Sequence, residues 1–347
     1  MGRFETLDKQ AGAAWIADAF ARAIECARAF EGATAPNPPV GCVLLDDEGR
    51  QLAAAAHQKA GGPHAEALAI EACRANGTTP QVHTAVVTLE PCNHHGRTPP
   101  CSEALLATPV RVVWIACRDP NTQVAGGGAE RLAAAGLAVH FLDELDDPRA
   151  SSLKRAADRL IAPFAHRMHT GLPFVTVKQA VTGEGSMIPP AGSKTFTSSS
   201  SLRLAHVLRR RADAILTGSG TILADEPLLT VRHVADHPGK HRMLAILDRR
   251  GRVPPAYLEA AQARGFVPII ARDPAEALAA LGDAGALEVL VEAGPRVTEA
   301  MLSRGLWDEH VLIESLPAAE GGDRISVRRR DAAGDISEGG VDVLGYY

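Results

Sequence analysis

Two short segments of the 347-residue chain contain residue types that bind metals and transfer protons. In PHAE, His64 precedes Glu66 by two positions, and in PCNHHGRTPPC, Cys92 precedes Cys101 by nine positions. One imidazole and two thiolates can bind zinc, and three protein ligands leave the fourth position for water, as in catalytic zinc sites. Zinc lowers the pKa of a bound water to about 7. These residues therefore predict a hydrolytic metal site.

Prolines beside these residues indicate how the side chains are positioned. Pro63 follows two glycines and is typical of a helix start, so we expect His64 and Glu66 in the first turn of a helix. Cys101 follows two prolines and also opens a helix, whose N-terminus lowers the pKa of a thiol. Glu66 is not needed as a ligand. We expect it to take a proton from the water and give it to a leaving amine.

The other cysteines and the loop histidines are interpreted differently. A disulfide framework is not expected in a chain of this length without a secretory signal. Four cysteines lie in apolar runs and are predicted to be core residues: Cys26, Cys42, Cys73 and Cys117. His94 and His95 follow Cys92 in the loop. They are interpreted as solvated neighbours of the site, with direct substrate contact as the alternative.

Hydrophobic patterning predicts an α/β protein of two domains, residues 1–150 and 151–347. An amphipathic helix over 13–30 is followed by a hairpin and then by short helices alternating with strands, which indicates a three-layer domain with a partly parallel sheet. The second half repeats the alternation, with a helix near 200–212. Its predicted strands are 174–181, 213–220, 242–248, 266–271, 286–294 and 310–316.

Composition narrows the functional class. The formal net charge of −5 argues against a general nucleic-acid binder, although local arginines could hold a small anion. No apolar run is long enough to span a bilayer, and the N-terminus lacks a signal-peptide pattern. We therefore predict a cytoplasmic protein without a membrane or nucleic-acid partner.

The first half resembles the deaminase half of the RibD family of bifunctional riboflavin-biosynthesis proteins. The segments APNPPVGCV, HQKAGGPHAE, EPCNHHGRTPPC and RDPNTQVAGGG carry the resemblance, which covers residues 10–150. It implies a cytidine-deaminase-like domain in which Zn²⁺ is bound by His64, Cys92 and Cys101, with Glu66 as the catalytic residue. It also implies that Asn37 contacts the pyrimidine and that His57 binds substrate.

The second half lacks the glycine fingerprint of a Rossmann dinucleotide site. Its predicted strand at 213–220 ends in small residues that allow close approach of a phosphate or ribose. Arg209 and Arg232 could bind an anionic, hydroxyl-rich ligand, and Asp225 could accept from sugar hydroxyls. Gly294 and Pro295 open a helix whose start is a further phosphate site.

The segments AILTGSGTILADEPLLTVR and VEAGP resemble the reductase half of the same family, which has a dihydrofolate-reductase-like fold and uses NADPH. The resemblance implies substrate contacts at Ser193, Arg209, Leu229, Arg232 and Glu292. It implies cofactor contacts at Ala180, Thr195, Thr221, Asp225, Arg249, Gly294 and Pro295. The match is looser here, because Thr195 stands where the family has a tryptophan and Arg249 where it has a serine.

Together with these patterns, the resemblance implies a bifunctional enzyme. The first domain would deaminate 2,5-diamino-6-(5-phosphoribosylamino)pyrimidin-4-one, and the second would reduce the ribosyl group to ribityl with NADPH. The alternatives are an active deaminase with a degenerate reductase half, and a zinc-stabilised module without catalysis. A nucleic-acid base deaminase would need a basic face and a C-x-x-C spacing. The resemblance also implies a homo-oligomer built through the reductase domains.

Overall fold

The computed structural model describes residues 2–93, 99–121, 127–189, 196–316, 322–330 and 336–340. The chain divides into two compact units, residues 1–169 and 170–347. The predicted boundary at residue 150 falls where helix α5 (Ala150–Thr170) begins. This helix buries Ala157, Leu160 and Ile161 in the core of the first unit, which extends that unit to residue 169.

The first unit is built on a mixed sheet with strand order β2-β1-β3-β4-β5 among the described residues. Strands β1 (Gly41–Leu45) and β2 (Gln51–Ala56) form the predicted hairpin, and β1 also pairs antiparallel with β3 (Thr84–Val87). Strands β4 (Val112–Ile115) and β5 (Ala138–Phe141) continue the sheet in parallel with β3. Short 3-10 helices span Thr79–Gln81 and Leu142–Glu144.

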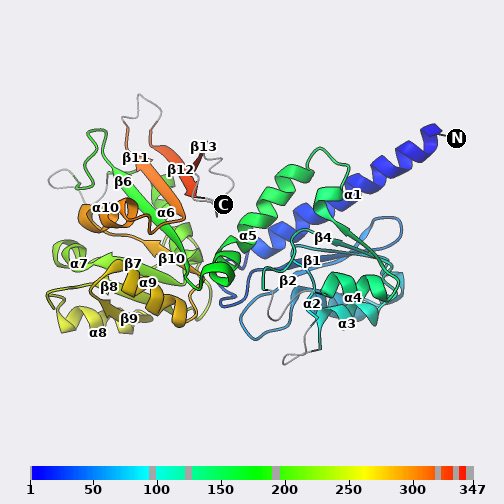
Figure 1. The fold of residues 1–347 in the computed structure, drawn as a ribbon, viewed down its shortest axis with the longest axis horizontal. Helices are drawn as coiled ribbons and strands as arrows, with labels where there is room; N and C mark the ends of the chain where they lie inside the picture. Colours follow the sequence, from blue (N-terminus) through cyan, green and yellow to red (C-terminus); the bar gives the residue numbers. More distant parts are fainter. Residues whose placement is uncertain are drawn as a thin grey trace. The chain divides into compact units, whose positions relative to one another are not determined.

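Helices cover both faces of this sheet and complete the three predicted layers (Figure 1). One face packs against α1 (Gly2–Arg28) and α5, with Phe20 and Val43 in the shared core. The other face packs against α2 (Ala65–Ala75), α3 (Cys101–Leu106) and α4 (Gly128–Ala134). Successive residues of a strand point to opposite faces of the sheet, so Val43 enters one core and Leu44 the other. Because helices cover both faces, β1 is buried along its whole length.

The second unit has a sheet with strand order β13-β12-β11-β6-β10-β7-β8-β9 among the described residues. The strands from β11 to β9 are parallel, and β12 and β13 extend one edge antiparallel. The bounds are β6 Phe174–Val181, β7 Ala214–Gly218, β8 Arg242–Leu247, β9 Phe266–Ala271, β10 Glu288–Val291, β11 Glu309–Glu314, β12 Arg324–Arg330 and β13 Ile336–Gly340.

Two groups of helices sandwich this sheet. Helices α9 (Pro274–Asp283) and α10 (Pro295–Ser303) cover one face, whereas α6 (Ser199–Arg211) and α8 (Pro255–Ala263) cover the other. The strand predicted over 213–220 is too long, because β7 ends at Gly218 and Ser219–Asp225 forms helix α7. Strands β12 and β13 were not predicted.

Candidate functional site

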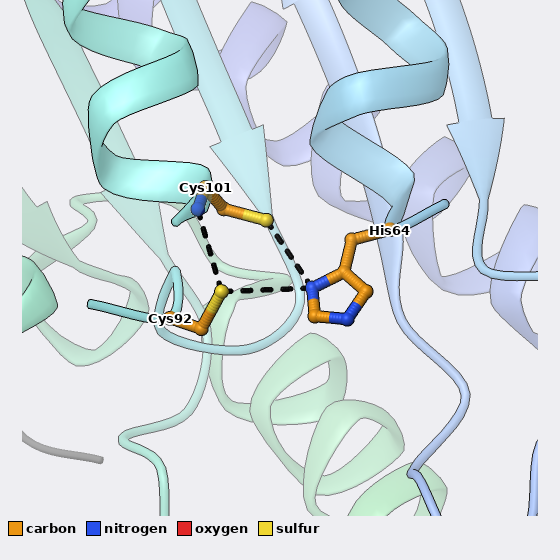
Figure 2. A group of neighbouring side chains, drawn as sticks. All are labelled: His64, Cys92 and Cys101. Carbon is orange, nitrogen blue, oxygen red and sulfur yellow. Dashed lines mark hydrogen bonds between the residues drawn. The ribbon is translucent and has the colours of Figure 1, made fainter. Parts of the chain in front are cut away.

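The predicted zinc ligands converge on one point in the first unit. His64 is the N-cap residue of α2, Cys92 lies in the loop after β3, and Cys101 is the first residue of α3. His64 Nδ1 lies 3.6 Å from Cys92 Sγ and 3.2 Å from Cys101 Sγ, and the three candidate ligand atoms lie within 4.8 Å of one another. Figure 2 shows the three side chains pointing toward a common centre.

These distances fit a tetrahedral zinc ion. Zn–N and Zn–S bonds of about 2.0 and 2.3 Å at tetrahedral angles separate the nitrogen from each sulfur by about 3.5 Å. The two observed separations of 3.6 and 3.2 Å lie close to that value. The soft thiolates and the imidazole are also suited to zinc rather than to magnesium or calcium. The site residues therefore match zinc in both donor type and spacing.

The two thiols of this centre have opposite pKa shifts. Hydrogen bonding from the Cys101 side chain lowers the pKa of Cys92 to about 4, and the His64 ring and the Cys101 backbone N–H act in the same direction. That backbone N–H donates to Cys92 Sγ over 3.3 Å, from the start of α3. The shared hydrogen bond and burial raise the pKa of Cys101. Without metal the cysteines thus share a proton, which zinc binding must release.

Glu66 lies beside the metal centre in the first turn of α2. Its side chain is buried, and burial raises the pKa of its carboxyl, with its own backbone N–H and the His64 charge opposing that shift. A raised pKa brings the carboxyl nearer to the pH at which it can both accept and release a proton. The position and environment of Glu66 therefore suit proton transfer.

A cavity of about 200 Å³ opens beside the metal centre. It brings the predicted substrate residues Asn37 and His57 together with His64, Glu66 and Cys92. The remaining lining residues are Pro38, Val40, Leu89, Glu90, Asp119, Asn121 and Phe164.

His57 lines this cavity, and a hydrogen bond sets the protonation of its ring. Its Nδ1 lies 2.9 Å from the carbonyl oxygen of Pro63, and because a carbonyl only accepts, Nδ1 carries the proton. The buried Nε2 then has a free lone pair, and it has no hydrogen-bond partner among the described residues. Burial lowers the pKa of the ring, which keeps it neutral. His57 is thus a neutral ring whose buried Nε2 can only accept a hydrogen bond.

The remaining predictions for this half have mixed outcomes. His94 and His95 lie outside the described residues. Cys42, Cys73 and Cys117 are buried as predicted, whereas Cys26 is only half-buried. Glu90, Asp119 and Asn121 line the cavity but were not predicted as site residues. A glutamate directly after the apolar run TAVVTL was the available signal, since a buried carboxylate needs partners.

In the second unit the predicted ligand residues gather at the carboxyl edge of the parallel strands. Ligands bind at this edge in open α/β sheets. Ala180 lies near the end of β6, Thr221 follows β7, Arg249 follows β8, and Glu292 and Gly294 follow β10. Gly294 donates its backbone N–H to Thr221 Oγ1 over 2.9 Å, which joins two predicted cofactor positions.

A buried ion pair forms the centre of the predicted substrate residues. Arg209 Nε and Nη2 donate to the two oxygens of Glu292 over 2.6 and 2.8 Å, and Lys178 Nζ lies 3.5 Å from the same carboxylate. Burial would raise the pKa of Glu292, but the Arg209 and Lys178 charges outweigh it and lower the pKa to about 2. The Arg209 guanidinium, which was expected to bind a ligand anion, is therefore bound to Glu292.

The other predicted residues of this half differ in exposure. Arg232 is exposed, and its backbone N–H donates to His206 Nδ1 over 2.9 Å. Leu229 is buried and has a left-handed backbone, with φ of 57°. Asp225, Arg249 and Pro295 are exposed. Ser193 and Thr195 lie outside the described residues.

Both halves match known domain families. Residues 13–117 match the cytidine and deoxycytidylate deaminase zinc-binding region, and residues 173–328 match the RibD C-terminal domain. The riboflavin biosynthesis protein RibD of Mycobacterium tuberculosis is 39% identical over 292 residues, covering 84% of this chain and 82% of that protein. RibD of Escherichia coli is 38% identical over 214 residues, covering 61% and 54%.

Solved structures agree with these matches. Acinetobacter baumannii RibD, form 1, superposes with a TM-score of 0.74 at 32% identity and covers 88% of each chain. A diaminohydroxyphosphoribosylaminopyrimidine deaminase/5-amino-6-(5-phosphoribosylamino)uracil reductase from Thermotoga maritima gives a TM-score of 0.76 at 30% identity, covering 88% of this chain and 87% of that chain.

These findings confirm the predicted pairing of a cytidine-deaminase-like domain with a RibD reductase domain, together with the predicted cofactors Zn²⁺ and NADPH. In the part of the chain that the structure describes, no helix combines the length and apolar character needed to cross a bilayer. The identity to RibD proteins extends over most of the chain and across both domains. The chain therefore belongs to the RibD family of bifunctional riboflavin-biosynthesis enzymes.

Proposed function

We propose that the first domain deaminates 2,5-diamino-6-(5-phosphoribosylamino)pyrimidin-4-one and that the second reduces the ribosyl group of the product to ribityl. The observation that carries this proposal is the convergence of His64, Cys92 and Cys101 beside Glu66 on one cavity. The names of the two activities of the Thermotoga maritima relative supply the substrate class.

Each residue of the first site has a role in this proposal. His64, Cys92 and Cys101 would hold zinc, which when bound lowers the pKa of a water to about 7. Glu66 takes a proton from the attacking water and delivers it to the departing amino group, so that ammonia leaves and a carbonyl forms. His57 binds the pyrimidine from the wall of the cavity, and Asn37 offers an amide that can both donate and accept.

The second site supplies binding and orientation, since NADPH itself provides the hydride. Thr221 fixes the turn at Gly294, where the backbone lies beside the proposed cofactor site. Arg232 offers an exposed guanidinium to the substrate phosphate. Arg209 acts on substrate chiefly through Glu292, because it holds that carboxylate in its ionised form.

The decisive experiment compares Glu66→Gln with Glu71→Gln, an exposed glutamate on the same helix that pairs with Arg74. Loss of a general acid–base group lowers rates by about 10²–10⁴-fold. We expect Glu66→Gln to lose ammonia release to this extent and to keep its zinc by metal analysis. NADPH oxidation with the deaminated substrate should stay unchanged. Glu71→Gln should resemble the wild type.

The alternatives give different results in the same assays. A non-catalytic zinc module predicts equal ammonia release in the two variants, and full activity of Glu66→Gln would refute the proposed role. A degenerate reductase predicts no NADPH oxidation at saturating cofactor. A nucleic-acid base deaminase predicts deamination of an oligonucleotide. Cytoplasmic location and a homo-oligomer remain predictions, and light scattering of the purified chain tests the second.

A further inference from the structure

Glu90 occupies an unusual place in the first domain, because it lies two residues before Cys92 and also lines the cavity. Its side chain is 6% exposed. Its backbone N–H donates to the carbonyl oxygen of Cys117 over 2.8 Å, which fixes the end of β3 to the segment that follows β4. A buried carboxylate at this point requires hydrogen-bond donors.

The donors come from the two described flanks of one loop. Glu90 Oε2 accepts from the backbone N–H of Asp119 over 3.4 Å, and Glu90 Oε1 accepts from the backbone N–H of Ala129 over 3.1 Å. Asp119 and Asn121 line the cavity, and Asp119 Oδ1 accepts from the N–H of Asn121 over 2.9 Å. The Glu90 carboxylate therefore holds both Asp119, which lines the cavity, and Ala129, in the first turn of α4.

A backbone contact strengthens the same connection. A Cβ atom added at Gly128 would lie 1.9 Å from the carbonyl oxygen of Pro91 and 3.5 Å from Glu90 Cγ. The first turn of α4 is thus packed directly on the residue that precedes Cys92. The metal-ligand loop and the segment that carries Asp119 and Asn121 are joined at Glu90 by hydrogen bonds and at Gly128 by close packing.

We propose that Glu90 is a positioning residue that sets Asp119 and Asn121 relative to the metal centre and thereby determines substrate affinity. This inference rests on the proposed deaminase function. Glu90 does not transfer protons, a role assigned to Glu66. Loss of this clamp, meaning the Glu90 hydrogen bonds to Asp119 and Ala129, should displace the segment that carries Asp119 and Asn121. The zinc ligands should stay in place, because His64 and Cys101 come from other elements and the Ser102 N–H donates to the Cys92 carbonyl oxygen over 3.2 Å.

The test compares Glu90→Gln with Glu130→Gln, which removes the same charge from an exposed position on α4. In Glu90→Gln the side-chain NH₂ replaces one carboxylate oxygen, so one of the two backbone N–H groups loses its acceptor. The free-energy cost of one unsatisfied buried donor corresponds to about a tenfold change in substrate affinity. We expect KM for the pyrimidine substrate to rise about tenfold, kcat to fall less than threefold, and zinc content to stay unchanged. Glu130→Gln should keep the wild-type KM.

A second pair of variants leaves Glu90 untouched and covers the case in which Glu90→Gln does not fold. Ala129→Pro removes the N–H donor at the second position of α4, where that N–H has no partner within the helix, whereas Ala129→Ser keeps it. Ala129→Pro should raise KM and Ala129→Ser should not. An unchanged KM in a folded, zinc-loaded Glu90→Gln variant would overturn the proposal. So would a hundredfold loss of kcat at constant KM, which would assign Glu90 to the chemistry.

Hydrogen–deuterium exchange separates this proposal from the proposed function. The amides of Asp119 and Ala129 should exchange faster in Glu90→Gln than in Glu130→Gln, whatever reaction the site catalyses. If the wild type releases no ammonia, the deaminase proposal fails while the exchange result still tests the clamp. Equal exchange in both variants would contradict the clamp even in an active enzyme.

Discussion

Arg209 and Glu292 form a two-point ion pair in the second domain, although they lie 83 positions apart in the sequence. The guanidinium donates from Nε and Nη2 to both carboxylate oxygens, and the two side chains are only 12% and 7% exposed. Lys178 adds a second positive charge to the same carboxylate. The cluster therefore fixes the ionised Glu292 at the end of β10.

Breaking this pair should destabilise the second domain. Removing one partner of a buried ion pair costs about 3–5 kcal/mol, because the other charge stays buried without compensation. We expect the unfolding free energy of the second domain to fall by this amount in Glu292→Gln. The measurement is urea unfolding followed by Trp307 fluorescence, in a variant background that lacks Trp15 and Trp114. Asp273→Asn should lose much less, because its pair with Arg304 is exposed to solvent and asparagine keeps the N-cap acceptor for the Ala275 N–H. Similar losses in both variants would contradict the expectation.

The same pair gives the second domain a defined acid sensitivity. The folded-state pKa of Glu292 is about 2, below the ordinary value of 4.5, so the stabilisation is fully present above pH 4.5. It is lost as the pH falls toward 2, since the unfolded chain then binds a proton that the folded chain does not. In Glu292→Gln the unfolding free energy should fall less steeply between pH 4.5 and pH 2, because the contribution of this carboxylate is missing. Parallel curves of unfolding free energy against pH would show that the carboxylate does not contribute.

Gly128 should be intolerant of a methyl group. The added Cβ would overlap the Pro91 carbonyl oxygen at 1.9 Å and push on the residue before Cys92. We expect Gly128→Ala to lower the unfolding free energy of the first domain by about 1–3 kcal/mol or more and to reduce zinc occupancy. Gly220→Ala is the control, because no atom lies within 4 Å of its added Cβ and its backbone needs no left-handed conformation. Full zinc occupancy and stability in Gly128→Ala would disprove the predicted strain.

Local signals in the sequence were sufficient for most of the fold. Apolar runs bounded by turn residues predicted the strands from β1 to β11, and prolines before His64 and Cys101 indicated the two helix starts that position these ligands. Strands β12 and β13 were missed because they lack a continuous apolar pattern. RISVRRR becomes a strand through its pairing with β11 on one side and with β13 on the other.

Long-range partners explain what the sequence could not predict at the sites. Glu90 accepts from residues 29 and 39 positions away, and neither donor is a side chain, so no residue type marks the contact. Arg209 was predicted from its charge to hold a ligand anion, but its partner Glu292 becomes visible only when α6 and β10 are folded together. Residue chemistry predicted which groups matter, whereas the fold determines which groups each of them contacts.

The approach of Gly128 to Pro91 also limits how this enzyme can evolve. The two segments touch through main-chain atoms, with no room between them for even one carbon. An insertion or deletion in either segment would therefore move the other, and with it the residue that carries a metal-binding sulfur. Acquisition of a new pyrimidine substrate is expected to proceed by exchange of side chains around the cavity, at constant length of both segments.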